Sequence, residues 1–333
     1  MSLTNIQIGS WNVIGGRANY GVRSSSKIYF VDGDNGSDGN TGYDPENAVA
    51  TIYRALTLAN AWDVIYVFPK AWTLGNLWLG TAYQDTTNMT VTYAKQGLAM
   101  VGVSPQAVCG QAYSVVIKEV ESSTAANLNV YAPMCAFENL AFERDGTETG
   151  GQLRFSNDDA GTYEANLGSV YNCHFYLGNG TTGSSYGGAL IGWALWGLTV
   201  TACSFQDCRI GVGWSSSGPT AGNLTVKDCV FRSRYGSGSQ IDADIAVYTQ
   251  GSGHVTILNN YFAHYIPSLT AGAIKRWISV DSDRSGLVAG NHFGGAIGTT
   301  YTIGYGGTGV QLPTTVGIGA NYCNGALMPV VAV

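Results

Sequence analysis

An eight-residue segment, LTVKDCVF at positions 224–231, recurs at a regular interval along the chain. Seven copies align without gaps on its phenylalanine, and successive copies lie 33, 30, 26, 31, 31 and 30 residues apart. The aligned position holds Phe142, Phe175, Phe205, Phe231, Phe262, Phe293 and Cys323. Five residues earlier stand Phe137, Val170, Val200, Val226, Ile257, Val288 and Ile318. Two residues earlier stand Leu140, Cys173, Cys203, Cys229, Asn260, Asn291 and Asn321. Such a period is typical of a solenoid in which each repeat forms one coil.

The spacing within each copy predicts the shape of a coil. Side chains alternate between the two faces of a strand, so positions −7 and −5 share one face. Position −3 holds Asn139, Asn172, Ala202, Asp228, Asn259, Gly290 and Ala320. Most of these residues tolerate a left-handed backbone, which would turn the chain sharply before positions −2 and 0 face inward. The sequence therefore predicts an all-β protein, a single-stranded right-handed parallel β-helix with roughly 30 residues per coil.

The start of the chain has a different pattern. A strand at 28–31, a loop rich in Gly, Asp and Asn, an amphipathic helix near 50–61 and a strand at 64–68 are predicted. Because open strand edges invite association, we expect the short helix to cap the N-terminal end of the solenoid. We divide the chain into an N-terminal arm at 1–26, a cap and first coil at 27–73, and the β-helix at 74–333.

This opening resembles a known protein class. The segment VDGDNGSDGNTG is followed by Pro45, Thr51, Ile52, Ala55, Leu56, Ala59, Asp63, Ile65, Val67 and Pro69. That order resembles the start of many pectate-lyase-like β-helix proteins, and the resemblance implies a cap and a first coil here. The chain departs from the pattern at Trp62, where glycine is usual, and at Lys70, where glycine usually follows the proline.

Composition restricts the possible partners and location. The net charge is −6 with no basic run, which argues against a nucleic-acid groove. No apolar stretch approaches the roughly 20 residues of a membrane span, and the first residues lack the features of a signal peptide. With its short polar arm and Gly/Ser/Thr/Tyr-rich surface, the chain is similar to phage tailspikes and other virion β-helix proteins. That similarity implies a homotrimer, made in the host cytoplasm and joined to other virion proteins through the arm.

Three of the seven cysteines, Cys173, Cys203 and Cys229, share one column. Neighbours in such a column are close enough for a disulfide, but we expect small thiols that fill an interior ladder. No paired CxxC spacing indicates a metal site. The loop from Asp32 to Asp38 resembles the start of a calcium loop, but Tyr43 stands where the bidentate glutamate would be. We therefore predict no metal and no other cofactor.

Two acidic pairs are candidates for catalysis. Asp242 and Asp244 form one pair, and Asp281 and Asp283 form the other. Residues two apart share a strand face, and paired carboxylates suit glycoside hydrolysis. Asp244 and Lys275 each stand 18 residues before a column phenylalanine, so we expect them to stack on the outer surface, with the lysine keeping the aspartate ionised. The alternative is that these carboxylates are solvated turn residues.

Exposed aromatic rings are candidates for glycan binding without catalysis. Trp193, Trp196 and Trp214 lie on neighbouring coils, and a tryptophan face stacks well on a pyranose. The alternative is packing in the interior or at a subunit interface. His174 and His292 directly precede the phenylalanine column, so we expect them to point outward.

Three functions are compatible with these features, because one fold can host any of them. The first is a virion-attached tailspike or surface decoration that binds a polysaccharide or cell-surface glycan. The second is a polysaccharide-degrading enzyme, a glycoside hydrolase or a lyase, that uses the acidic pairs. The third is a structural scaffold. We expect the first.

Overall fold

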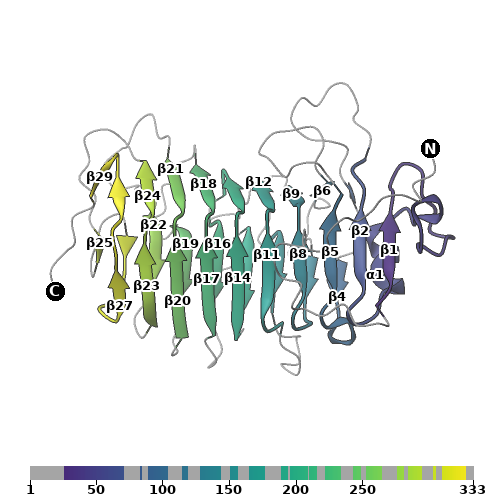
Figure 1. Ribbon diagram of the computed structural model, residues 1–333, viewed down its shortest axis with the longest axis horizontal. Coiled ribbons are helices and arrows are strands. Elements are labelled where there is room, and N and C mark those ends of the chain that lie inside the picture. The colour runs from purple at the N-terminus through teal and green to yellow at the C-terminus, as the bar shows by residue number, and fades with distance from the viewer. Residues whose placement is uncertain are drawn as a thin grey trace.

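The computed structural model describes residues 26–70, 83–84, 89–103, 115–118, 128–143, 151–156, 165–176, 189–193, 196–208, 210–215, 222–233, 243–248, 253–264, 276–280, 284–294, 303–304 and 310–327. In these ranges the chain winds repeatedly through three parallel sheets, in a stack that runs from the purple N-terminal end to the yellow C-terminal end (Figure 1). The predicted right-handed parallel β-helix is therefore confirmed.

Sheet 1 begins each coil. Its strands, in spatial order, are β1 (Ile28–Val31), β2 (Val64–Val67), β5 (Ala99–Gly102), β8 (Ala136–Glu138), β11 (Gly168–Tyr171), β14 (Gly197–Thr201), β17 (Asn223–Lys227), β20 (Gly253–Leu258), β23 (Arg284–Ala289) and β27 (Val316–Ile318).

Sheet 2 follows each sheet 1 strand around a corner. Its strands are β3 (Tyr83–Gln84), β6 (Val115–Lys118), β9 (Leu140–Glu143), β12 (His174–Tyr176), β15 (Ser204–Gln206), β18 (Val230–Ser233), β21 (Tyr261–His264), β24 (His292–Gly294), β28 (Tyr322–Cys323) and β29 (Ala326–Leu327). The last of these, β29, pairs antiparallel with β28 and ends the sheet.

Sheet 3 completes each coil. Its strands are β4 (Met89–Val91), β7 (Leu128–Val130), β10 (Leu153–Phe155), β13 (Leu190–Trp193), β16 (Val212–Ser215), β19 (Ala243–Tyr248), β22 (Arg276–Val280), β26 (Val310–Gln311) and β25 (Ile303–Gly304).

The corner between sheets 1 and 2 is a single left-handed residue. Six of the seven −3 positions have φ between 48° and 68°, namely Asn139, Asn172, Ala202, Asp228, Asn259 and Gly290. Asparagine, aspartate and glycine adopt this conformation at low cost, which explains why they recur there. The predicted corner is therefore confirmed at these six positions.

The phenylalanine column fills the interior beneath sheet 2. Six rings, from Phe142 to Phe293, stack with centroids 4.7–5.1 Å apart, and all six are at most 2% exposed. This spacing matches the distance between adjacent strands, because each ring is held by one coil. The phenylalanine column of sheet 2 and the valine and isoleucine ladder of sheet 1 belong to the same apolar core.

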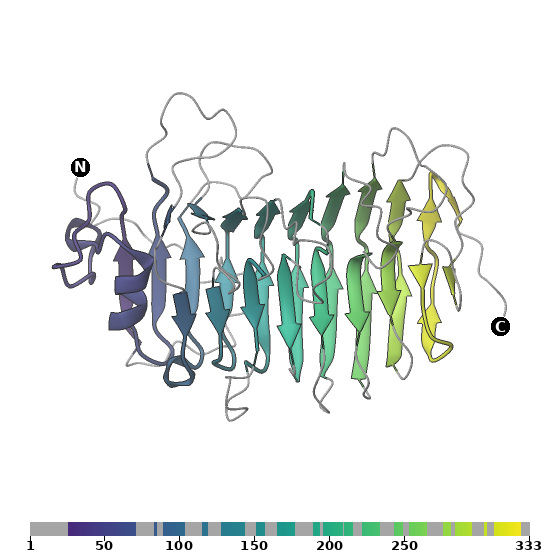
Figure 2. The same cartoon turned by 180° about the vertical axis from the view of Figure 1, so that it is seen from behind.

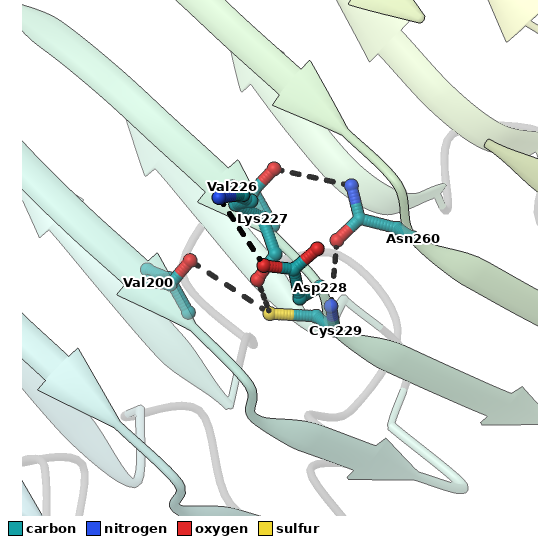
Figure 3. A network of polar contacts seen from close by, with 6 residues as sticks. All are labelled: Val200, Val226, Lys227, Asp228, Cys229 and Asn260. Carbon is teal, nitrogen blue, oxygen red and sulfur yellow. Dashed lines mark hydrogen bonds and ion pairs between the residues drawn. The ribbon is translucent and has the colours of Figure 1, made fainter. Parts of the chain in front are cut away.

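The Cys/Asn column lies at the corner and is also buried. The backbone N–H of Cys229 donates to Oδ1 of Asn260 at 2.9 Å, and Nδ2 of Asn260 donates to the carbonyl of Val226 at 3.1 Å (Figure 3). The thiol of Cys229 donates to the carbonyl of Lys227 at 3.3 Å. Cys173, Cys203 and Cys229 are free thiols, so the prediction of an interior thiol ladder is confirmed.

The N-terminal end is covered by helix α1 (Ile52–Leu58), which packs against β1, β2 and β4 (Figure 2). It is shorter than the predicted 50–61. The carboxylate of Asp38 accepts hydrogen bonds from the backbone N–H groups of Ala50 and Thr51, which keeps these two residues outside the helix. The Thr51 hydroxyl then caps the first turn by accepting from the Arg54 N–H at 3.0 Å. No helix in the described part of the chain has the length and apolarity of a membrane span.

Candidate functional site

Of the four residues of the predicted acidic site, the structure describes Asp244. Asp242, Asp281, Asp283 and Lys275 lie outside the described residues. Asp244 lies in β19 and is only 3% exposed, so its carboxylate is covered and does not lie open at the surface. Its neighbours Ala243 and Ile245 pair with Arg276 and Ile278. The position level with Asp244 is therefore Trp277 and not Lys275.

The cause of this error is the variable length of the coil connections. Val255 follows Ile245 by ten positions, whereas Gly286, which pairs with Val255, follows Ile278 by eight. Equal offsets from the phenylalanine column therefore do not place residues side by side in sheet 3.

The two acidic pairs belong, in the sequence, to adjacent strands of sheet 3. Asp242 directly precedes β19, and Asp281 directly follows β22. Ala243 pairs with Arg276, while Val247 pairs with Val280, so the strand ends next to these pairs are four positions apart along the sheet. That separation is roughly 13 Å at the rise of a β-strand. An active site built from Asp242, Asp244, Asp281 and Asp283 stays a prediction.

The three candidate tryptophans lie on or next to strands of two different sheets. Trp196 is 59% exposed and directly precedes β14 of sheet 1. Trp193 and Trp214 belong to adjacent strands of sheet 3, but Trp214 pairs with Gly192 and not with Trp193. The side chains of Trp193 and Trp214 lie outside the described residues. Trp196, whose side chain is described, has the exposure that the binding prediction requires.

The acidic loop near the N-terminus is held by its own hydrogen bonds. The carboxylate of Asp32 accepts from the backbone N–H groups of Asp34 and Asn35 at 2.9 and 3.0 Å. The carboxylate of Asp38 accepts from Ala50, Thr51 and the Thr51 hydroxyl at 2.9–3.0 Å. These hydrogen bonds hold the loop in its conformation and give Asp32 and Asp38 a structural role. Within the described ranges, no three His, Cys, Asp or Glu side chains gather in a way that could hold a metal ion.

The outer face of sheet 2 gathers polar and aromatic side chains from seven consecutive coils. The strand residues before and after each column residue point outward, because side chains alternate. The residues before it, in register across the sheet, are Ala141, His174, Ser204, Val230, Tyr261, His292 and Tyr322. The residues after it are Glu143, Tyr176, Gln206, Arg232, Ala263 and Gly294. We call these two rows the sheet 2 face.

The sheet 2 face is open towards the C-terminal end. Arg232 and His292 are exposed, and Tyr261 is 50% exposed. The rings of His292 and Tyr322 stack with centroids 5.2 Å apart. An open face with aromatic rings and hydrogen-bonding groups is suited to a sugar chain, since rings stack on pyranoses and polar groups bind hydroxyls. The sequence predicted that the two histidines point outward but did not indicate that the two rows form one binding face, although the positions on either side of the phenylalanine column are evident from the repeat.

The same face is closed around His174. This side chain occupies the outward row as predicted, but it is only 6% exposed. Its Nδ1 lies 2.5 Å from the Ser204 hydroxyl oxygen on the next strand. Burial and, to a smaller extent, the positive charge of Arg232 together lower the pKa of His174 to about 4, against the opposing effect of a hydrogen bond with the Ser204 backbone. The imidazole is therefore neutral at pH 7.

Other ionisable groups surround this histidine. Glu143 on β9, Tyr176 on β12 and Arg232 on β18 lie in the second row of the sheet 2 face, and Lys118 on β6 extends that row beyond Glu143. The Tyr176 ring stacks against His174 with centroids 6.4 Å apart. The face thus combines a buried neutral base, a hydroxyl, carboxylate and cationic groups in adjacent coils.

Three parallel sheets, a stacked interior and a capping helix define a right-handed parallel β-helix protein with the pectate-lyase-like fold. No family model matches the sequence, and no curated protein matches it. Among solved structures, pectin methylesterase from carrot is similar over 93% of this chain and 90% of its own, with a TM-score of 0.54 and 12% identity. This similarity establishes the shared fold.

Two further solved structures are similar at lower scores. Pectin methylesterase from Aspergillus niger in deglycosylated form has a TM-score of 0.49 and 13% identity, covering 90% of this chain and 86% of its own. A rhamnogalacturonan lyase has a TM-score of 0.46 and 14% identity, covering 90% of this chain and 75% of its own. Function has to be argued from this chain's own residues.

Proposed function

We propose that this protein binds a polysaccharide or cell-surface glycan along the sheet 2 face. The observation that supports this proposal is the open row of Tyr261, His292 and Tyr322, with Arg232 in the row beside it. Each coil presents one side chain per row at the regular spacing of parallel strands. A regular ladder of rings and hydrogen-bond donors suits an extended ligand that is itself built of repeating units. Because the sheet is rigid, the protein loses little conformational entropy when the ligand binds.

We further propose the setting in which this binding takes place. The low charge, the polar N-terminal segment and the Gly-rich coils support a virion-attached tailspike or surface decoration, assembled as a homotrimer and joined to other virion proteins through residues 1–26. The solved pectin methylesterase from carrot is named for pectin, a polysaccharide, which supports a carbohydrate ligand as the class to test first.

The binding proposal is tested with a glycan array and a tyrosine substitution. Tyr261→Ala should weaken binding to the recognised glycan about tenfold, because an aromatic stacking contact contributes on the order of 1 kcal/mol. The matched control is Tyr53→Ala in helix α1, since Tyr53 has a similar exposure of 47% but lies at the capped end. Equal affinities for wild type and Tyr261→Ala would place the ligand elsewhere. No binding to any member of a broad panel would contradict the function itself.

A further inference from the structure

We propose that Ser204 and His174 form a nucleophile–base pair that hydrolyses acyl esters on a glycan bound to the sheet 2 face. The pair is formed by adjacent strands, β12 and β15, whose outward residues are in register. The Ser204 hydroxyl oxygen lies 2.5 Å from His174 Nδ1, within the range in which a histidine can remove a serine proton. The ester substrate class rests on the proposed glycan function, whereas the nucleophile does not.

The surroundings of the pair support a chemical role. His174 is buried while Ser204 is half-buried, so the base is shielded from water and the hydroxyl remains at the surface of the sheet. The imidazole is neutral at pH 7, and in the tautomer with its hydrogen on Nε2 it can accept a proton at Nδ1. Gln206 on β15 and Arg232 on β18 lie in the adjacent row and supply donors on the same face. Donors beside a nucleophile can stabilise negative charge that develops on a carbonyl oxygen.

A second serine–histidine contact in this chain provides a comparison. His254 Nδ1 lies 3.2 Å from the Ser285 hydroxyl, again across adjacent strands, but on the outer face of sheet 1. The contact is exposed, and the Ser285 hydroxyl also donates to the Gly253 carbonyl at 3.5 Å. His254 is exposed whereas His174 is buried, so the contact of His254 with Ser285 has the character of a surface hydrogen bond. Ser285 is therefore a matched internal control.

The reaction proceeds in two balanced steps. In the first, Ser204 Oγ attacks the ester carbonyl and its proton passes to His174 Nδ1; the C–O bond then breaks, and the sugar alcohol leaves with that proton. In the second, water attacks the acyl–Ser204 carbonyl and gives a proton to His174. The acyl–serine bond breaks, the proton returns to Ser204 Oγ, and the carboxylic acid is released. No oxidant, reductant or metal is required.

The proposal is tested on the full-length wild-type protein with a fluorophosphonate reagent, which reacts with serine hydroxyls activated by a neighbouring base. Peptide mass spectrometry should locate the label on Ser204 and not on Ser285. His174→Gln should reduce the labelling rate at least about 100-fold, since it removes the base but keeps a polar side chain of similar size. Ser285→Ala should label as wild type does. The labelling rate of wild type should fall as the pH drops towards 4, because the base becomes protonated.

The proposal would be overturned if Ser204 of the wild type carried no label, or if wild type and His174→Gln were labelled equally. Neither result depends on the folding of a serine variant. Acetate release from an acetylated glycan gives the second readout, and it should fall to background in Ser204→Ala. The two proposals fail separately. A labelled Ser204 in a protein that binds no glycan refutes the glycan function, and a bound glycan with an unlabelled Ser204 refutes the nucleophile–base pair.

Discussion

At the scale of single residues, the corner positions show how backbone conformation restricts the sequence. Trp62 has φ of 70°, the left-handed conformation that a glycine at this position in pectate-lyase-like proteins would adopt without strain. The indole requires space, and Gly97 provides it, because a Cβ at Gly97 would overlap the Trp62 ring. Gly97 itself has φ of 71°. The departure from the usual motif is thus compensated by a glycine in the next coil.

This compensation predicts an energetic coupling between the two positions. Gly97→Ala should destabilise the protein by about 2–4 kcal/mol, the sum of left-handed strain and overpacking against the indole. In a Trp62→Gly background only the strain remains, so the same substitution should cost about 1–2 kcal/mol. Denaturant unfolding of the four proteins measures the coupling. An equal cost of Gly97→Ala in both backgrounds would show that the indole does not occupy this space in solution.

At the scale of elements, some interior ladders stabilise the coils by apolar packing, and the asparagine ladder stabilises them by hydrogen bonding. In the C-terminal coils, Asn260, Asn291 and Asn321 bond to one another through their side-chain amides at 2.9–3.0 Å. Each amide also satisfies backbone groups of the corner, as Nδ2 of Asn321 does with the carbonyls of Val288 and Gly319. In the preceding coils cysteine thiols occupy the same column. Backbone groups left without partners there would be costly, because the site is buried.

Asn260 is the first asparagine of the column and follows Cys229 in the preceding coil. Its substitution tests directly whether a thiol can replace the amide. Asn260→Ala removes the acceptor of the Cys229 N–H and the donor to Val226, so it should destabilise the protein by about 2–5 kcal/mol. Asn260→Cys should cost clearly less, because a thiol serves the same column in the coils before it. Asn223→Ala, at an exposed asparagine in β17, is the control and should change stability by less than about 0.5 kcal/mol. Equal losses for the alanine and cysteine variants would show that the thiol cannot replace the amide.

At the scale of the whole molecule, the two ends of the solenoid differ. Helix α1 covers the N-terminal end, whereas β29 and β25 end sheets 2 and 3 at the other (Figure 1). Among the described residues, no strand pairs with the outer edge of β27 in sheet 1. Nearby, Leu327 is 66% exposed. An open edge beside exposed apolar surface favours association with another chain, which supports the proposed homotrimer.

The oligomeric state is measured by light scattering at micromolar concentration. We expect a mass near three times 35.1 kDa. Leu327→Asp should lower that mass if the C-terminal end takes part, whereas Tyr53→Asp, in helix α1 at the opposite end, should not. A mass of 35.1 kDa for the wild type would contradict the homotrimer.

The repeat by itself determined the coils, the corners and the interior ladders of this protein. These features depend on local rules, since strand alternation and left-handed propensity act within a few residues. The tertiary structure decided which side chains meet on the surface. Connections of unequal length shifted Asp244 from Lys275 to Trp277, and neighbouring coils buried His174 beside Ser204. Surface contacts between coils depend on the lengths of the connections between strands. These lengths follow no periodic pattern in the sequence, so the contacts are defined only once the coils have stacked.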